Sequence, residues 1–244
     1  MFNYATPKGA DTRAKILSTA LALFRERGFE ATTVRDIARA SGLSLGAAYH
    51  YFASKDAIVL AYYHEVESEH QARVEKALQR ASSLAERLAV PFHTKLDILA
   101  GDRPLLGALL RFTGQPSHPL SFLGGATSDI RLHSMRIFAA PLRDERLSDD
   151  VRTLAPLALW ALQMGILLFF LYDQSPNQQR TRRIVDRSVA LFLWLLKATK
   201  LPGLRTLPRK LLEVLNDAGL VPHAGEIAAA SLDGLALPPS EARA

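Results

Sequence analysis

The amino-acid sequence predicts an all-α protein. Most long segments repeat apolar residues at the three- and four-residue spacing of a helix, and the alternating Val/Ile/Thr runs typical of strands are absent. Helix start and stop residues recur along the chain, with Ser, Thr or Asp before apolar segments and Gly or Pro after them. With 244 residues, of which 48% are hydrophobic and 22% charged, the chain suits one or two globular domains.

Composition restricts the possible chemistry. The cysteine count is zero, which excludes disulfide scaffolds, thiolate metal sites and cysteine nucleophiles, and suits a reducing cytoplasm. The formal net charge of +6 favours an anionic partner, either nucleic acid or a membrane surface. Half of this excess lies in residues 1–56, where eight Lys/Arg stand against five Asp/Glu. This region therefore carries the strongest signal for an anionic partner.

Four helices are expected in the first third of the chain. The first begins near residues 11–12 and ends at Gly28, where glycine suits a helix C-terminus. Thr33 and Asp36 have capping-box spacing and start a short second helix that ends at Gly42. The other two are a third helix capped by Ser44 and running to about Phe52, and a fourth capped by Ser54 and running from Lys55 to about Ser82.

The rest of the chain also reads as helices separated by short connections. Residues 113–128 are rich in Gly, Pro and Ser, and we expect a loop with at most a helical turn there. The residues after 219 show little periodicity and predict a loosely structured tail. The further helices are expected at 84–99, 103–113, 129–143, 149–173, 178–200 and 208–218.

The second and third helices have the features of a helix-turn-helix. Ile37 and Ala38 fit the inner face of the second helix, and Gly42 permits the sharp turn. On the third helix, the small residues Gly46 and Ala47 allow close approach to DNA. Donors are expected at the surface from Tyr49, His50 and Tyr51, and Lys55 stands at the start of the next helix, where backbone N–H groups attract phosphate.

A long ordered pattern over residues 12–60 resembles the N-terminal domain of TetR-family transcriptional regulators. Residues 61–244 show only a looser resemblance, to that family's variable, all-helical ligand-binding and dimerisation domain. The pattern consists of Ala22-Leu23-Phe24, Gly28-Phe29, Thr32 to Ala38, Ser41 to Ser44 and Gly46 to Ala57.

The resemblance implies roles for individual residues. Thr33, Tyr49 and Lys55 would contact DNA phosphates, and Arg35 would reach a base edge or a phosphate. Few of the groove-facing residues can bond base edges, so specificity would rest on Arg35, on the Tyr/His group or on DNA shape. The residues expected where the recognition helix meets the major groove are Ser44, Leu45, Ala47, His50 and Tyr51.

Several other motifs have weaker interpretations. Residues 42–46 match G-x-S-x-G, but a serine hydrolase needs a preceding strand, and none is expected. Glu67 and His70 have the E-x-x-H spacing of di-iron bundles, yet no second copy occurs, so we expect a solvated helix face and no metal site. The basic stretch 197–210 is expected to be a solvated surface.

The uncharged segment 154–172 is long enough to span a membrane. It contains Pro156 and Gln163, and basic residues flank it on both sides, so a helix buried in a bundle or dimer interface is the better interpretation. Gln163 and Arg111 lie among apolar neighbours and are the candidate ligand-binding residues. The aromatic residues expected in the core are Tyr62, Tyr63, Phe92, Phe112, Phe122, Phe138, Trp160 and Phe169.

These observations predict a ligand-responsive DNA-binding regulator rather than an enzyme, with no cofactor and no membrane partner, located in the cytoplasm. The expected domains are a helix-turn-helix domain at 1–56, a helical ligand-binding and dimerisation domain at 57–219, and the tail at 220–244. The resemblance implies a homodimer, formed through 154–172 and 184–196, that represses from a palindromic operator until an effector binds. A bundle metalloprotein, a membrane-anchored protein and a nucleoid-type binder remain alternatives.

Overall fold

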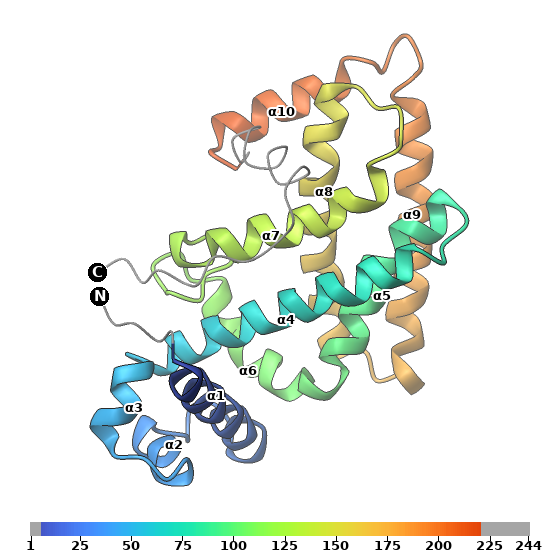
Figure 1. The fold of residues 1–244 in the computed structure, drawn as a ribbon. Helices are drawn as coiled ribbons and strands as arrows, with labels where there is room; N and C mark the ends of the chain where they lie inside the picture. Colours follow the sequence, from blue (N-terminus) through green and yellow to red (C-terminus); the bar gives the residue numbers. More distant parts are fainter. Residues whose placement is uncertain (1–5, 221–244) are drawn as a thin grey trace. The chain divides into compact units, whose positions relative to one another are not determined.

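The computed structural model describes residues 6–220, and every regular element in that range is helical (Figure 1). The all-α prediction is confirmed. The predicted tail lies, from residue 221 onward, outside the described residues. The α-helices are α1 (Pro7–Arg27), α2 (Val34–Ala40), α3 (Leu45–Tyr51), α4 (Lys55–Leu78), α5 (Leu84–Leu99), α6 (Arg103–Thr113), α7 (Ser128–Ala139), α8 (Asp149–Tyr172), α9 (Gln179–Ala198) and α10 (Leu207–Asp217).

Most predicted helix bounds agree with the structure to within a few residues. The clearest error is the start of α1, which begins at Pro7 and not near residues 11–12. The Thr6 hydroxyl accepts a hydrogen bond from the backbone N–H of Gly9 at 3.2 Å, and proline suits the first helical position because it has no N–H to satisfy. The Thr-Pro pair was the sequence signal for this earlier start.

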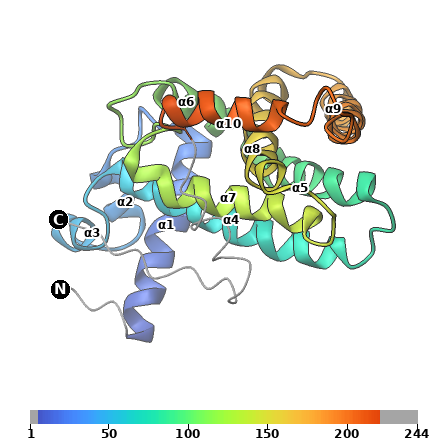
Figure 2. The ribbon, with the colours of Figure 1, turned by 90° about the horizontal axis from the view of Figure 1, so that it is seen from above.

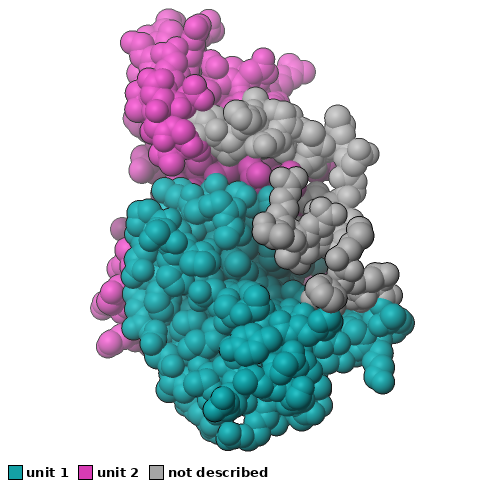
Figure 3. Space-filling view, turned by 90° about the vertical axis from the view of Figure 1, so that its left-hand side faces the viewer, with its two compact units in different colours: residues 1–73, 94–131 teal, residues 74–93, 132–244 magenta. Residues whose placement is uncertain are grey.

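The helices group into two compact units, coloured separately in Figure 3. Unit 1 comprises residues 1–73 and 94–131, and unit 2 comprises residues 74–93 and 132–244. These bounds differ from the expected domain boundary at residue 56, because α6 side chains belong to the same hydrophobic cluster as α1 to α3. The domain division at residue 56 stays a prediction.

The core of unit 1 is one hydrophobic cluster shared by helices distant in sequence. Ile37 of α2 and Phe24 of α1 are fully buried in it, together with Leu109 of α6. The rings of Phe24 and Phe29 meet edge to face at 5.1 Å, and Phe29 meets Phe112 in the same way at 5.6 Å. Packing of α2 against α1, and of α3 against α2, thus supports these two helices, which have only seven residues each.

A polar network ties the start of α6 to α1 and α4 within unit 1. Asp102 accepts hydrogen bonds from Arg25 Nε at 2.6 Å, from a second Arg25 nitrogen at 3.1 Å, and from the Tyr62 hydroxyl at 2.6 Å. Burial would raise the pKa of Asp102, but the bonds from Arg25 and Tyr62 outweigh it and lower that pKa. The carboxylate is therefore held charged while it joins three helices.

A second buried polar cluster corrects the expectation that Glu67 and His70 face solvent. Both side chains are buried, and the Lys95 ammonium donates to Glu67 Oε1 at 2.5 Å. His70 Nδ1 lies 3.6 Å from Glu67 Oε2. Burial opposes ionisation of Glu67, yet Lys95 and His70 outweigh it and lower its pKa to about 2. Lys95, 25 residues beyond His70 in the chain, supplies the charge that makes burial tolerable.

Unit 2 is built around α8, which packs against both α9 and α10. Ser148 caps the N-terminus of α8, and Phe92 and Phe138 lie 4.8 Å apart within the unit's core. By length and composition α8 is the one helix within residues 6–220 that qualifies as a membrane span, a property shared by core helices of soluble proteins. Beyond its first turn α8 is buried on only part of its surface. Its exposed positions there carry no charge and are Ala158, Ala161, Gly165, Leu168, Phe169 and Tyr172.

Replacing Lys95 with methionine is expected to leave the buried Glu67 carboxylate without its ammonium partner. We expect the free energy of unfolding to fall by about 3–5 kcal/mol, the usual result of breaking a buried ion pair from one side. The double variant Glu67→Leu/Lys95→Met should recover most of that loss, since no charge then remains buried. Urea denaturation measures both, with the exposed Lys76→Met as the matched control. A single variant as stable as the control would contradict this account of the pair.

Candidate nucleic-acid interface

Helix α2 starts with the capping box that the sequence predicts. The Thr33 hydroxyl accepts from the backbone N–H of Asp36 at 3.1 Å, and the Asp36 carboxylate accepts from the backbone N–H of Thr33 at 3.0 Å. The hydrogen bond from the Thr33 hydroxyl is the largest cause of a lowered pKa at Asp36. Thr33 and Arg35 are both exposed at this end of the helix. The cap thus fixes where two predicted DNA-contacting residues lie.

The turn between α2 and α3 depends on Gly42. Its φ of +71° lies in the left-handed region, which glycine adopts without the steric cost of a Cβ atom. The backbone N–H of Leu43 then donates to Ala38 O at 2.9 Å, which closes the end of α2. Together these two residues set the direction in which α3 leaves the turn.

Helix α3 presents a small, partly polar outer surface. Ser44 caps it by accepting from the N–H of Ala47 at 3.1 Å, and Ala48 is the residue buried beneath it. Gly46 is exposed with open space around its Cα, as close approach to DNA requires. Tyr49 is 50% exposed. Ser44 and His50 are also exposed, while Leu45 and Ala47 are half-buried.

Tyr51 differs from its expected position at the surface. It is half-buried and packs against the hydrophobic cluster of unit 1, with its ring 5.4 Å from that of His50. Because α3 has 3.6 residues per turn, Tyr51 and Ala48 share a side of the helix. Of the three consecutive aromatic residues, Tyr49 and His50 therefore form the exposed pair.

The side chain of Lys55 is held by contacts within unit 1. Its ammonium donates to Phe29 O at 2.7 Å and to Glu30 O at 3.4 Å, and it lies 4.4 Å from the centre of the Phe29 ring. These contacts hold the connection between α1 and α2 against the start of α4. A phosphate contact from Lys55 would have to compete with them.

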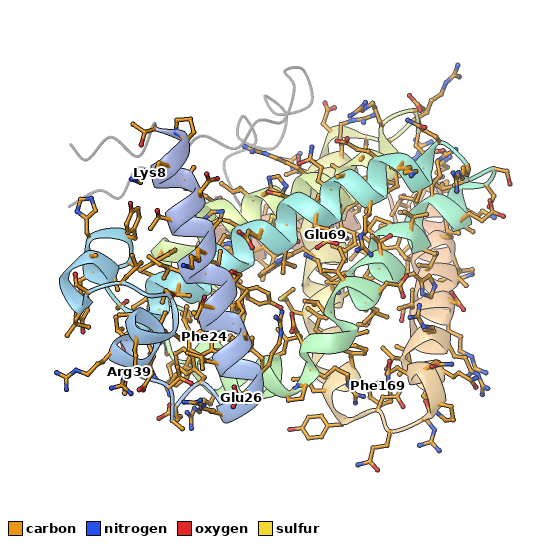
Figure 4. The ribbon with its side chains drawn as sticks, turned by 60° about the horizontal axis from the view of Figure 1, so that its bottom comes forward. Lys8, Phe24, Glu26, Arg39, Glu69 and Phe169 are labelled. Atoms are coloured by element: carbon orange, nitrogen blue, oxygen red, sulfur yellow. The ribbon has the colours of Figure 1, made fainter. Side chains whose placement is uncertain are left out.

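Arg39 is a candidate that the sequence analysis did not single out. It lies four residues after Arg35 on α2, and its side chain is 76% exposed and extends into solvent (Figure 4). Its guanidinium is 4.0 Å from Asp36, too far for a strong bond. The spacing of the two arginines on one short helix was the available signal, because residues four apart share a helix face.

The two candidate ligand residues belong to different units. In unit 1, Arg111 is half exposed, forms an ion pair with Glu30 and lies 4.7 Å from the centre of the Phe112 ring. In unit 2, Gln163 is completely buried, and neither its amide oxygen nor its amide nitrogen has a hydrogen-bond partner among the described residues. Buried amides without partners are rare in folded proteins.

Two aromatic residues expected in the core are instead exposed. Phe122, in the α6–α7 connection, is 39% exposed, and Phe169 of α8 is 38% exposed (Figure 4). Helical spacing identifies an apolar face but does not say whether the same chain covers it. Across residues 6–220, no group of three or more His, Cys, Asp or Glu side chains is arranged to hold a metal ion.

Comparison with known families matches most of the chain. Residues 16–62 match the family of bacterial regulatory proteins named tetR, and residues 87–210, just over half of the chain, match the tetracyclin repressor-like C-terminal domain. The HTH-type transcriptional repressor KstR2 of Mycobacterium tuberculosis is 53% identical over 47 residues. That match covers 19% of this chain and only 24% of the repressor.

Solved structures share the fold over a longer range. The TetR transcriptional regulator from Nitrosomonas europaea is 22% identical with a TM-score of 0.60, covering 75% of this chain and 98% of its own. The regulator FadR from Bacillus subtilis, solved in complex with stearoyl-CoA, is 20% identical with a TM-score of 0.56, covering 72% of this chain and 96% of its own. On the two family-domain matches, this chain belongs to the TetR family of bacterial transcriptional regulators.

Proposed function

We propose that the protein is a transcriptional repressor that binds a palindromic operator as a homodimer and is released by a small-molecule effector. The observation that carries this proposal is the capped α2–Gly42–α3 unit, whose outer surface leaves Tyr49 and His50 exposed beside the small Gly46. Such a surface can enter a major groove, where a helix fits. We place the protein in the cytoplasm, where its DNA would be.

The proposed DNA contacts combine exposed side chains with half-buried ones such as Lys55. Thr33, Tyr49 and Lys55 contact phosphates, which fix the register of the protein on the duplex. Arg35 reaches a base edge or a phosphate from the start of α2. The side chains proposed to face the DNA major groove have little hydrogen-bonding capacity, so DNA shape supplies part of the specificity. The residues proposed to line the DNA groove are Ser44, Leu45, Ala47, His50 and Tyr51, and the Tyr51 ring meets the His50 ring edge to face.

The proposed dimer interface is the apolar surface of α8 and α9. On α8, Leu168 and Phe169 are exposed, and on α9 Leu191 and Trp194 are 58% and 63% exposed. Soluble proteins rarely leave so many neighbouring apolar side chains in water unless a partner covers them. In a two-fold symmetric contact the same residues of both subunits are buried, and the contact sets the spacing between the recognition helices of the two subunits.

The proposed effector contact is the amide of Gln163. The residues three and four positions before and after Gln163 on α8 are all apolar: Leu159, Trp160, Ile166 and Leu167. A ligand that is largely apolar and carries a carbonyl or hydroxyl group would satisfy the amide. Because the FadR protein of similar fold was solved with stearoyl-CoA, a long-chain acyl-CoA is the first effector to test. Arg111 is a weaker candidate, since Glu30 already pairs with it.

Release from DNA requires the effector to favour one arrangement of the dimer over another. A ligand with equal affinity for both arrangements shifts nothing, however tightly it binds. A coupling free energy of about 1–3 kcal/mol suffices for a useful switch. Selection of bound DNA from a random pool, with and without stearoyl-CoA, tests operator, symmetry and response together. Recovery of no preferred sequence would instead favour a nucleoid-type binder.

Removing single cations from the DNA-binding surface should change the salt dependence of operator binding. We expect Arg35→Ala and Lys55→Ala each to lower the slope of log affinity against log salt by about one, the signature of a lost phosphate contact. The exposed Arg80→Ala, on the α4–α5 connection, is the control and should leave the slope unchanged. If Lys55→Ala destabilises the fold but keeps the slope, its bonds to Phe29 and Glu30 are its whole role.

A charge on the exposed side of α8 should prevent dimerisation. Leu168 is 46% exposed in the protomer, so Leu168→Asp adds a carboxylate without disturbing the core. We expect sedimentation equilibrium to find monomers with greatly weakened operator binding, because a dimer's two half-site contacts are then lost. Leu123→Asp, at a 48% exposed leucine in the α6–α7 connection, is the matched control. A dimeric Leu168→Asp variant would show that the interface lies elsewhere.

Replacing Gln163 with leucine should separate effector response from folding. The substitution removes a buried amide that has no partner among the described residues, so we expect thermal stability to be unchanged or higher. Operator binding should persist, while release by stearoyl-CoA should need at least about tenfold more ligand, the effect of losing roughly one hydrogen bond of 1.4 kcal/mol. Gln179→Leu, at an exposed position on α9, is the control. An unchanged response would remove Gln163 from the effector site.

A further inference from the structure

Helix α10 buries only one side of its apolar surface. Pro208 is buried and Leu212 and Leu215 are half-buried, at the i, i+4, i+7 spacing of one helix face. This face accounts for the packing of α10 against α8. Three further apolar residues repeat the same spacing one position earlier, and they remain exposed. We name them the α10 flank: Leu207 at 43%, Leu211 at 44% and Val214 at 66%.

The α10 flank continues a longer run of exposed apolar residues. On α9 the run contains Leu191, Trp194 and Leu195, and in the connection that follows it contains Leu201 and Leu204, which are 57% and 39% exposed. From residue 191 to residue 214, successive members of this run are at most four residues apart in sequence. The one longer interval is the six residues from 195 to 201. Figures 1 and 2 show α9 and α10 on either side of α8, joined by this connection.

We propose that the second copy of this chain covers the α10 flank together with α8 and α9, so that the dimer interface has three helices from each subunit. The inference rests on the proposed homodimer and extends its surface. The flank is contiguous in sequence with the α9 surface, and α10 packs on α8, which bears the other half of that surface. One partner can therefore cover all three helices.

Charge on α10 favours a protein partner over an anionic surface. The helix carries two cations and two anions, and Arg209 Nε is 3.2 Å from Glu213, so α10 has no net charge to offer a phosphate or a lipid headgroup. The flank itself contains only Leu and Val. DNA has no apolar surface of matching size, whereas the centres of dimer interfaces are apolar and depleted of charge.

A charge placed on the α10 flank should weaken the dimer. We expect Leu211→Glu to raise the dimer dissociation constant by about 30-fold or more, the effect of losing an interface hot spot. Asn216→Glu is the matched control, because it adds the same charge at an exposed position on the opposite side of α10. Sedimentation equilibrium measures both, and circular dichroism checks that both remain folded. A dissociation constant equal to that of the control would overturn the proposal.

A thiol probe provides a second measurement, in which the substitution on α10 does not itself have to weaken the dimer. The chain has no cysteine, so Leu211→Cys introduces a single thiol. We expect this thiol to lose most of its maleimide labelling in the dimer and to regain it in the Leu168→Asp background. Asn216→Cys should label equally in both backgrounds. Equal labelling of Leu211→Cys in dimer and monomer would show that the partner does not cover the α10 flank, and would overturn the proposal.

These results separate the proposal from the proposed dimer itself. A wild-type chain that is monomeric at all concentrations refutes both. A dimer that Leu168→Asp dissociates but Leu211→Glu does not keeps the α8–α9 interface and removes α10 from it. Cosedimentation of wild type with phosphatidylglycerol vesicles, lost in Leu211→Glu while dimerisation is unchanged, would assign the flank to a lipid surface and overturn the proposal.

Discussion

The recognition helices depend on a hydrophobic cluster that they do not form alone. Helices α2 and α3 have seven residues each, and helices of that length are unstable in water unless they pack on something larger. Ile37 of α2 belongs to the cluster that includes Phe24 of α1 and Leu109 of α6, and Tyr51 of α3 packs against it. The local caps and the Gly42 turn shape these two helices, and the cluster holds them in place.

Polar contacts connect both ends of α6 to the rest of unit 1. Asp102, just before α6, bonds to Arg25 and Tyr62, and Arg111 near its other end pairs with Glu30. Whatever moves α6 has a path of charged hydrogen bonds to α1, α4 and the α1–α2 connection, and such bonds are stronger than neutral ones.

Local sequence signals located the helices and the turn of the helix-turn-helix well. The capping box of Thr33 and Asp36 and the positive φ of Gly42 depend on residues within four positions of each other, so the pattern alone identifies them. The same holds for the Ser44 cap of α3. The solvated interpretation of Glu67 and His70 was wrong because the partner that neutralises Glu67 is Lys95 on another helix. Lys55 is similar: its position at the start of α4 was evident, but its bonds to Phe29 and Glu30 were not.

The sequence by itself thus determined the fold class, the helix-turn-helix and the family, because caps, turns and apolar spacing act over a few residues. Only the tertiary structure decided which apolar faces the chain covers for itself. The exposed Phe169 and Leu211 stand next in sequence to the buried Phe170 and the half-buried Leu212, so one residue of rotation about a helix axis separates solvent from core. Burial depends on the packing of distant helices, and that packing is what leaves Gln163 without a partner among the described residues and the α10 flank open.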